Sequence, residues 1–254
     1  MPESLSAWNE QNAAGLVHWL RAGGQLGEWA DHTLEDIQFA SLVLGLDEGN
    51  TVLNLGCGWG RHAIALAHYG LNVIGLDASS SLLAFAKETC EQVNITVRWV
   101  HGDLGDLALT EPVDAVVQFN GNLLEWAETP AEALFILDQI HAILKPAGHF
   151  LFGSPDWKAS PPRHEKSRAD TPRTTELYSH IFDPDSRTMH SQAVVIDRDG
   201  SQRMYQRRSW HPSAEQMADL LYQANFDIEG QLNAFNYLPY DPSRPGLVWL
   251  ARRR

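Results

Sequence analysis

The stretch Val52-Leu53-Asn54-Leu55-Gly56-Cys57-Gly58-Trp59-Gly60-Arg61 decides the fold. A mostly apolar strand runs into glycines at alternate positions, and a helix is expected to begin directly afterwards. Glycine suits such a turn because the chain bends tightly and the backbone must approach a ligand without a Cβ in the way. The following helix offers amide groups and a positive dipole end to a negatively charged group. Glycines also make plain strand-to-helix turns, so the motif alone leaves a purely structural interpretation open.

The pattern of strand and helix continues on the carboxyl side of this motif. Apolar strands are expected at residues 51–55, 72–76, 95–100, 113–119 and 149–152. Helices are expected between most of them, at residues 61–69, 80–92 and 131–144. Such alternation, with strands this apolar, predicts a parallel sheet covered on both faces. The run Lys145-Pro146-Ala147-Gly148 is expected to end the last of these helices and turn the chain into the next strand.

The flanking regions have patterns of their own. Residues 1–32 are expected to be irregular or partly helical, and Thr33 to Asp36 fits a capping box that opens a helix ending at Gly45 and Gly49. Residues 155–173 are polar and proline-rich, which predicts a loop or flexible lid. Turn signals then separate three strands of an expected antiparallel meander at residues 175–182, 189–197 and 202–210. A helix at 213–224 and strands at 227–232 and 246–251 are expected to complete the chain.

Composition and charge exclude several classes of protein. The formal net charge of −13 over 254 residues argues against a nucleic-acid partner, because neutralising phosphates needs clustered Lys and Arg. No apolar run is long enough to span a membrane, and the N-terminus does not resemble a signal peptide. Cys57 and Cys90 lack metal-ligand spacing, so no metal site is expected, and reduced thiols fit a cytoplasmic protein.

Two carboxylates follow the next strands of the expected sheet. Asp77 ends the strand at residues 72–76, where it could accept hydrogen bonds from both hydroxyls of a ribose or cap the helix that begins near Ser79. Asp103 ends the third strand at the same sheet edge, either as a ligand-binding group or as an exposed loop carboxylate. A Gly-x-Gly-x-x-Gly pattern for NAD is not formed, because position 61 is Arg and the glycine falls at Gly60.

Together these residues and the run Leu144–Gly148 resemble class I S-adenosylmethionine-dependent methyltransferases over roughly residues 50–153. The resemblance implies that the glycine turn cradles the methionine part of S-adenosylmethionine, that the second-strand acid binds the ribose and that the third-strand acid reaches the adenine amine. The cofactor-binding residues it implies are Asn54, Gly56, Gly58, Gly60, Asp77, Ala78, Asp103, Leu104 and Asn120. Asn54 departs from the family, which commonly has an acid at that position.

A narrower resemblance is to glycine and sarcosine N-methyltransferases and their small-molecule relatives. Gly121-Asn122 is similar to their Gly-Asn turn, and Arg208 to Pro212 resembles a segment of theirs. This likeness implies a substrate site that includes Asn122, Trp210 and His211, although Trp210 could instead pin the meander onto the sheet. Ser154 stands about where the glycine enzymes keep a carboxylate-binding arginine, which counts against glycine as the substrate.

We therefore expect a single doubly wound α/β domain over residues 1–254. Its expected parts are an N-terminal helical cap at 1–48, a cofactor core at 49–153, a β-rich lid or substrate insertion at 154–210, and a C-terminal helix with closing strands at 211–254. The expected function is methyl transfer to an N or O atom of a small molecule. A non-catalytic S-adenosylmethionine or S-adenosylhomocysteine sensor and an RNA or protein methyltransferase remain alternatives, and the sequence identifies neither a catalytic base nor an oligomeric state.

Overall fold

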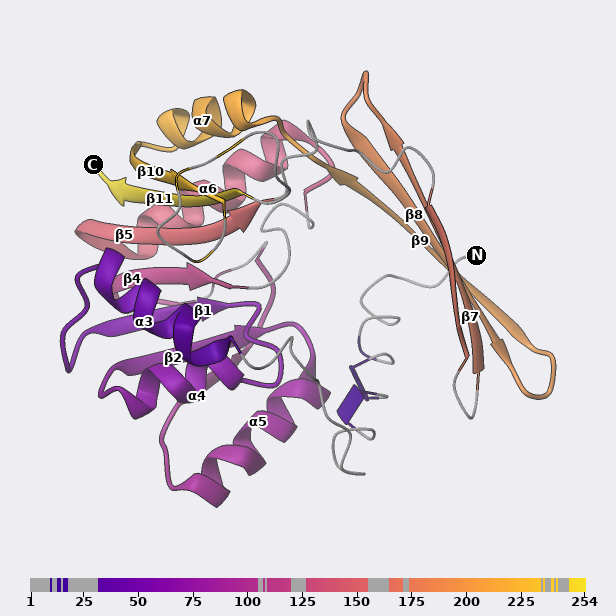
Figure 1. Ribbon diagram of the computed structural model, residues 1–254, viewed down its shortest axis with the longest axis horizontal. Helices are drawn as coiled ribbons and strands as arrows, with labels where there is room; N and C mark the ends of the chain where they lie inside the picture. Colours follow the sequence, from indigo (N-terminus) through magenta and orange to yellow (C-terminus); the bar gives the residue numbers. More distant parts are fainter. Residues whose placement is uncertain are drawn as a thin grey trace.

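The computed structural model describes residues 10, 13–14, 16–17, 32–104, 107, 109–119, 127–154, 165–170, 174–233, 235, 239, 241 and 247–254. These residues form a seven-stranded sheet with helices on both faces and a separate four-stranded sheet. Figure 1 shows the four-stranded sheet standing apart from the helix-covered sheet and joined to it through the strand that leads into helix α7.

The seven-stranded sheet has the order β10-β11-β5-β4-β1-β2-β3. Its first five strands along the chain are mutually parallel. Strand β11 is antiparallel to both of its neighbours, β5 and β10, so β10 has the same direction as the first five strands. The strands are β1 (Thr51–Leu55), β2 (Asn72–Asp77), β3 (Arg98–His101), β4 (Val113–Gln118), β5 (Leu144–Ser154), β10 (Phe226–Leu232) and β11 (Leu247–Arg253). The prediction of a doubly wound, mostly parallel sheet is confirmed.

Helices cover both faces of this sheet, and each face has its own apolar cluster. One face packs against α3 (Thr33–Val43), α4 (Arg61–His68) and α5 (Ser80–Val93). The other packs against α6 (Pro130–Ile143) and α7 (Ala214–Gln223). The central strands β1, β2 and β4 are buried on both faces, so their apolar residues follow one another without the alternation that a half-exposed strand would have.

The four-stranded antiparallel sheet has the order β6-β7-β8-β9. Its strands are β6 (Glu165–Asp170), β7 (Thr174–Asp183), β8 (Thr188–Asp197) and β9 (Gln202–Trp210). The predicted meander is confirmed, but β6 lies inside the segment for which we expected a loop. This strand is polar, and its side chains from 166 to 170 are exposed. Strand β6 is therefore held by backbone pairing with β7. Because this pairing does not need apolar side chains, the sequence of β6 has no apolar pattern that would predict a strand.

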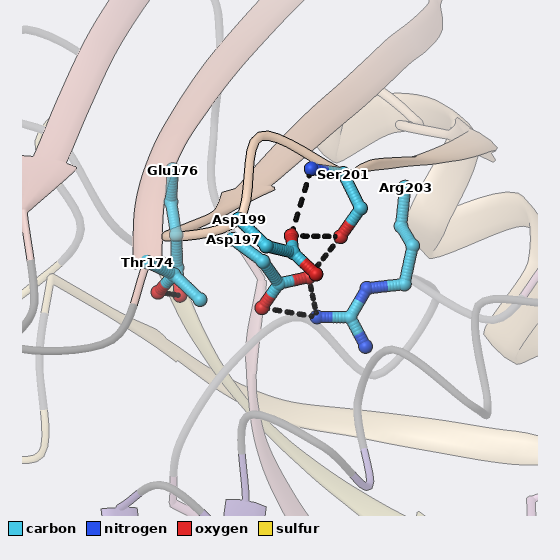
Figure 2. A network of polar contacts seen from close by, with 6 residues as sticks. All are labelled: Thr174, Glu176, Asp197, Asp199, Ser201 and Arg203. Carbon is cyan, nitrogen blue, oxygen red and sulfur yellow. Dashed lines mark hydrogen bonds and ion pairs between the residues drawn. The ribbon is translucent and has the colours of Figure 1, made fainter.

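The turn between β8 and β9 is closed by its own polar side chains (Figure 2). Asp199 accepts hydrogen bonds from the backbone N–H of Ser201 at 2.9 Å and from its hydroxyl at 2.6 Å. Arg203 pairs with Asp197 at 2.9 Å across the base of the turn, and Gly200 takes a φ of 85°. The Asp199-Gly200 turn signal is thus confirmed, and its acidic residues are accounted for by local structure.

Three local predictions need correction. Thr33 does not cap α3: residue 32 is the N-cap, the Thr33 hydroxyl accepts a hydrogen bond from Arg61 at 2.7 Å, and Asp36 pairs with His62. The strand expected from residue 95 begins at Arg98, because Asn94 ends α5 in a left-handed conformation with a φ of 54°. Tertiary partners and a helix end thus override these local patterns.

The third correction concerns residues 145–148, which lie within β5 rather than before it. Val113 pairs with Leu144 and Ala115 pairs with His149, so the register jumps across this run. A Cβ at Gly148 would lie 2.9 Å from the carbonyl oxygen of Asp114, which explains the glycine at this position.

The indole of Trp99 determines why two positions near the turn are glycine. A Cβ at Gly75 would lie 2.5 Å from Cζ3 of Trp99, and a Cβ at Gly60 would lie 2.5 Å from its Cη2. Trp99 thus lies against the strand and the helix start that carry these glycines. Gly60 also has a φ of 86°, so both space and backbone conformation select glycine there.

We expect Gly75→Ala to lower the free energy of unfolding by about 1–3 kcal/mol, the usual cost of overpacking a core. Gly230→Ala is the matched control, because a Cβ there would lie 3.6 Å from its nearest neighbour, an ordinary contact. Urea unfolding followed by circular dichroism measures both. A Gly75→Ala protein as stable as the Gly230→Ala protein would refute the role given to Trp99.

Candidate cofactor site

The glycine turn at the carboxyl end of β1 has a backbone that only glycine adopts easily. Gly56, Gly58 and Gly60 have φ values of 58°, 56° and 86°. A Cβ built at Gly56 or Gly58 would have no heavy atom within 4 Å, so conformation rather than crowding selects glycine at both. Burial and, to a smaller extent, the negative charge of Asp77 raise the pKa of the Cys57 thiol. The thiol therefore stays protonated and unreactive.

Asp77 is the centre of the hydrogen bonding at this edge. One carboxylate oxygen accepts from the N–H of Gly58 at 2.7 Å, and the other accepts from the N–H of Ser79 at 2.9 Å. Burial raises the pKa of Asp77, although both of these hydrogen bonds oppose the shift. The residue therefore joins the glycine turn to the start of α5, and each oxygen keeps a lone pair for a further donor.

The end of β3 lies beside Asp77. Asp77 and His101 are partners in the parallel register, and His101 Nε2 lies 3.0 Å from the carbonyl oxygen of Ala78. Asp103 and Ala78 are exposed at this edge, whereas Leu104 is buried in the apolar cluster on the α6 face. The structure thus brings Asp77, Ala78 and Asp103 to one edge, as their positions at strand ends predict.

Asn54 lies in the interior beneath the turn. Its side chain is 2% exposed, and its Nδ2 atom has no hydrogen-bond partner among the described residues. A buried amide without a partner is costly, so Asn54 is a donor available to a ligand or an ordered water. Its predicted contact with a cofactor stays a prediction. Asn120 and Asn122, which we predicted for the cofactor and the substrate, lie outside the described residues.

His62, in the first turn of α4, pairs with Asp36 of α3, a contact that the sequence does not reveal. His62 is 3% exposed, and its Nε2 lies 3.0 Å from the Asp36 carboxylate. Its ring stacks on Phe119, at the end of β4, with 4.2 Å between centroids. Burial lowers the pKa of His62 despite the acid beside it. The pair fixes α3 and β4 against the helix that follows the glycine turn.

Trp210 and His211 lie where the four-stranded sheet joins the core. The Trp210 side chain is 6% exposed within the apolar cluster on the α6 and α7 face, and the backbone N–H of Trp210 donates to the carbonyl of Ala127 at 2.7 Å. His211 is 5% exposed, with its Nε2 atom 2.8 Å from the Ser209 hydroxyl. Packing accounts for both side chains, and their assignment to a substrate site stays a prediction.

The arrangement at this edge fits the S-adenosylmethionine that the resemblance implies. The turn offers close backbone approach at Gly56 and Gly58, and Asp77 offers acceptors for two neighbouring hydroxyl groups. Among the described residues, no three His, Cys, Asp or Glu side chains are grouped so that they could hold a metal ion. None of the described helices is long and apolar enough to cross a membrane.

Comparison with known proteins agrees with this geometry. Residues 52–148 match the model of a family described as "Methyltransferase domain". Cyclopropane mycolic acid synthase 2 of Mycobacterium bovis is 37% identical over 116 residues, which is 42% of this chain and 37% of that protein. Cypemycin N-terminal methyltransferase of a Streptomyces species is 36% identical over 101 residues, 40% of each chain. The chain thus spans well under half the length of these curated relatives.

Solved structures share the fold over most of the chain. A methyltransferase from Clostridium acetobutylicum described as S-adenosylmethionine-dependent has a TM-score of 0.74, with 15% identity over 96% of this chain and 98% of that one. The CcbJ methyltransferase from Streptomyces caelestis has a TM-score of 0.72, with 21% identity over 87% of this chain and 89% of that one. At these identities the likeness establishes the fold.

The fold and the geometry at the sheet edge agree with the family match. Residues 52–148 match the methyltransferase-domain family, and they lie within a Rossmann-like fold of the class I methyltransferase type that carries an antiparallel sheet. The glycine turn, Asp77 and Asp103 all lie within the matched segment.

The environment of His211 gives a pH-dependent prediction. Burial, followed by the charges of Arg207 and Arg187, lowers the pKa of His211 to about 4. As the pH falls from 6.5 towards 4, the unfolded chain takes up a proton that the folded protein does not, so stability is lost in this window. We expect His211→Gln to reduce that loss by about 2–3 kcal/mol, as chemical unfolding at a series of pH values measures.

The exposed His190→Gln variant is the control for this experiment, because it removes a histidine from the same sheet. Its loss of stability between pH 6.5 and 4 is expected to equal that of the unaltered protein. Equal losses for His190→Gln and His211→Gln would contradict the buried, neutral state of His211.

Proposed function

We propose that this chain is an enzyme that transfers a methyl group from S-adenosylmethionine to an N or O atom of a small molecule. The single observation that carries the proposal is Asp77, which ends β2 within hydrogen-bond distance of the glycine turn and of the start of α5. The family match over residues 52–148 supports the same activity.

The bound cofactor supplies a methyl group already activated by a positively charged sulfur. The work of the protein is then to bind both partners, align the acceptor atom and exclude water. We propose that Gly56 and Gly58 hold the methionine end, Asp77 and Ala78 the ribose, and Asp103 and Leu104 the adenine. Asn54 is proposed to offer its buried amide donor to the same ligand.

Several features favour a small acceptor over RNA. The net charge of −13 opposes binding of a polyanion. The two curated relatives reported above are named for mycolic acid and for the N-terminus of cypemycin, and neither name refers to a nucleic acid. The four-stranded sheet adds ordered chain beyond what a cofactor site alone requires, and ordering it has an entropic cost that a substrate site would explain.

The narrower resemblance to glycine N-methyltransferases does not extend to the substrate in this proposal. Ser154, at the position of their carboxylate-binding arginine, is 7% exposed at the end of β5. A buried hydroxyl lacks the positive charge that a carboxylate prefers, so we do not include glycine among the proposed acceptors.

We expect the protein to bind S-adenosylhomocysteine and S-adenosylmethionine in isothermal titration calorimetry and to show no heat with NAD. Asp77→Ala should weaken binding by about 2–4 kcal/mol, because charge-assisted hydrogen bonds to the ribose are lost. Asp138→Ala, an exposed carboxylate on α6, should bind like the unaltered protein. Binding of NAD alone, or unchanged affinity in Asp77→Ala, would overturn the assignment.

The acceptor class is tested with S-adenosylmethionine labelled in its methyl group. We expect label to enter the low-molecular-weight fraction of a cell extract in the presence of the protein. Label confined to the RNA or protein fraction would contradict a small acceptor. Tight binding of S-adenosylhomocysteine with no label transferred to any fraction would favour the sensor.

A further inference from the structure

The four-stranded sheet has one covered face and one exposed face. Ala193, Val195 and Tyr205 lie on the covered face, where each is 5% exposed or less. Because side chains alternate along each strand, the other face carries the even-numbered residues 166–170, 190–196 and 202–208 and the odd-numbered residues 175–181. Figure 1 draws the helix-covered sheet to one side of this sheet. We call the exposed face the outward face.

The outward face carries an unbroken row of apolar side chains. Leu177 lies opposite Val194, and Val194 lies opposite Met204, so the row crosses three neighbouring strands. Leu177 and Met204 are 39% and 41% exposed, and Ile181, farther along β7, is 44% exposed. Antiparallel sheets with one face in solvent usually carry polar residues on that face. An apolar row at this place therefore indicates a surface that binds a partner.

The charge of the sheet favours a second copy of this chain as that partner. Residues 165–170 and 174–210 carry seven Lys or Arg and seven Asp or Glu, so the sheet and its turns are neutral. The remainder of the chain therefore holds the whole net charge of −13. Copies that meet through other surfaces bring like charges together, which opposes association, and the neutral sheet is where this repulsion is smallest. A neutral face also lacks the excess of basic residues that binding to anionic lipid requires.

The outward face is large enough for a stable dimer. Four strands that are spaced by about 4.8 Å, each about nine residues long at about 3.3 Å per residue, form a face of roughly 600 Å². Two such faces, packed about 10 Å apart as stacked sheets are, bury roughly 1,200 Å² in total. This area is at the lower end of the range for specific protein interfaces.

Two-fold symmetry allows the face to stack on itself in two simple ways. If the axis runs across the strands, β6 lies over the partner's β6, and the basic side chains of Lys166 and Arg168 from both copies meet. If the axis runs along the strands, β6 lies over the partner's β9 and β7 lies over the partner's β8. Arg168 then lies over the partner's Met204, which can cover the apolar stem of the arginine, and Leu177 lies over the partner's Val194. Only the second arrangement joins the apolar rows without bringing like charges together.

We propose that two copies of this chain form a dimer in which the outward faces of their four-stranded sheets stack about a two-fold axis along the strands. The apolar row of each copy covers that of the other, and each Arg168 lies against the partner's Met204. The interface is isologous, as in most dimers of identical chains. None of the residues proposed for the cofactor lies on the outward face, so the dimer does not depend on which ligand binds at Asp77.

Size-exclusion chromatography with light scattering tests the dimer. We expect a mass of twice the 28.4 kDa of one chain. Met204→Lys should raise the dissociation constant of the dimer about hundredfold, because it places a positive charge against the partner's Arg168. Met204→Glu should leave the dimer intact, because its carboxylate meets that same arginine. Phe135→Lys, which alters a large apolar residue that is 55% exposed on α6, is the matched control and should leave the mass unchanged.

A charge exchange distinguishes contact between copies from an effect within one chain. Three strand spacings, about 14 Å, separate Arg168 from Met204 in the same sheet, so their charges are largely screened from each other. The double variant Arg168→Glu/Met204→Lys should therefore dimerise again only if the two residues meet across the interface. Circular dichroism of each variant confirms that it is folded.

Three results would overturn the proposal. The first is a mass of 28.4 kDa for the unaltered protein at all concentrations up to about 100 μM. The second is a dimer that Met204→Lys leaves intact, and the third is a folded double variant that stays monomeric. A monomer that sediments with phosphatidylglycerol vesicles would assign the outward face to a lipid surface and would equally contradict the dimer.

Discussion

The site depends on the two hydrogen bonds that the carboxylate of Asp77 accepts. A parallel sheet brings the ends of β1 and β2 together, but it does not by itself fix the loops that follow them. Asp77 does so by accepting the Gly58 N–H with one oxygen and the Ser79 N–H with the other. The glycine turn and the start of α5 consequently form one rigid edge. Glu10 also contacts this edge, where it accepts hydrogen bonds from the Ser80 hydroxyl and the Ser81 N–H.

The three positions of the turn are glycine for different physical reasons. Gly56 and Gly58 have open space around a Cβ position and are selected by positive φ values. Gly60 is selected by its φ and by Trp99, which would collide with any side chain there and at Gly75. Gly56 and Gly58 are therefore the stronger candidates for direct approach to a ligand, whereas Gly60 serves packing beneath the turn. A single sequence motif thus contains two glycines that backbone conformation selects and a third that packing selects as well.

Sequence patterns predicted the parts of the structure that depend on local chemistry. The buried strands, the position of Asp77 and the Asp199-Gly200 turn follow from apolar runs, strand ends and turn residues, and the structure confirms them. The patterns failed where distant partners decide: Thr33 binds Arg61 instead of capping its helix, and β6 forms by backbone pairing without an apolar pattern. The docking of Glu10 on Ser81 was also missed, because no local pattern marks a contact across 71 residues.

A crystal structure of the protein with S-adenosylhomocysteine tests the central claim most directly. The account predicts both ribose hydroxyls on the Asp77 carboxylate, the amino-acid end of the ligand over Gly56 and Gly58, and Glu10 still bound to Ser81. A ligand bound away from the carboxyl ends of β1 and β2, or an Asp77 side chain that contacts only Gly58 and Ser79 in the complex, would contradict it.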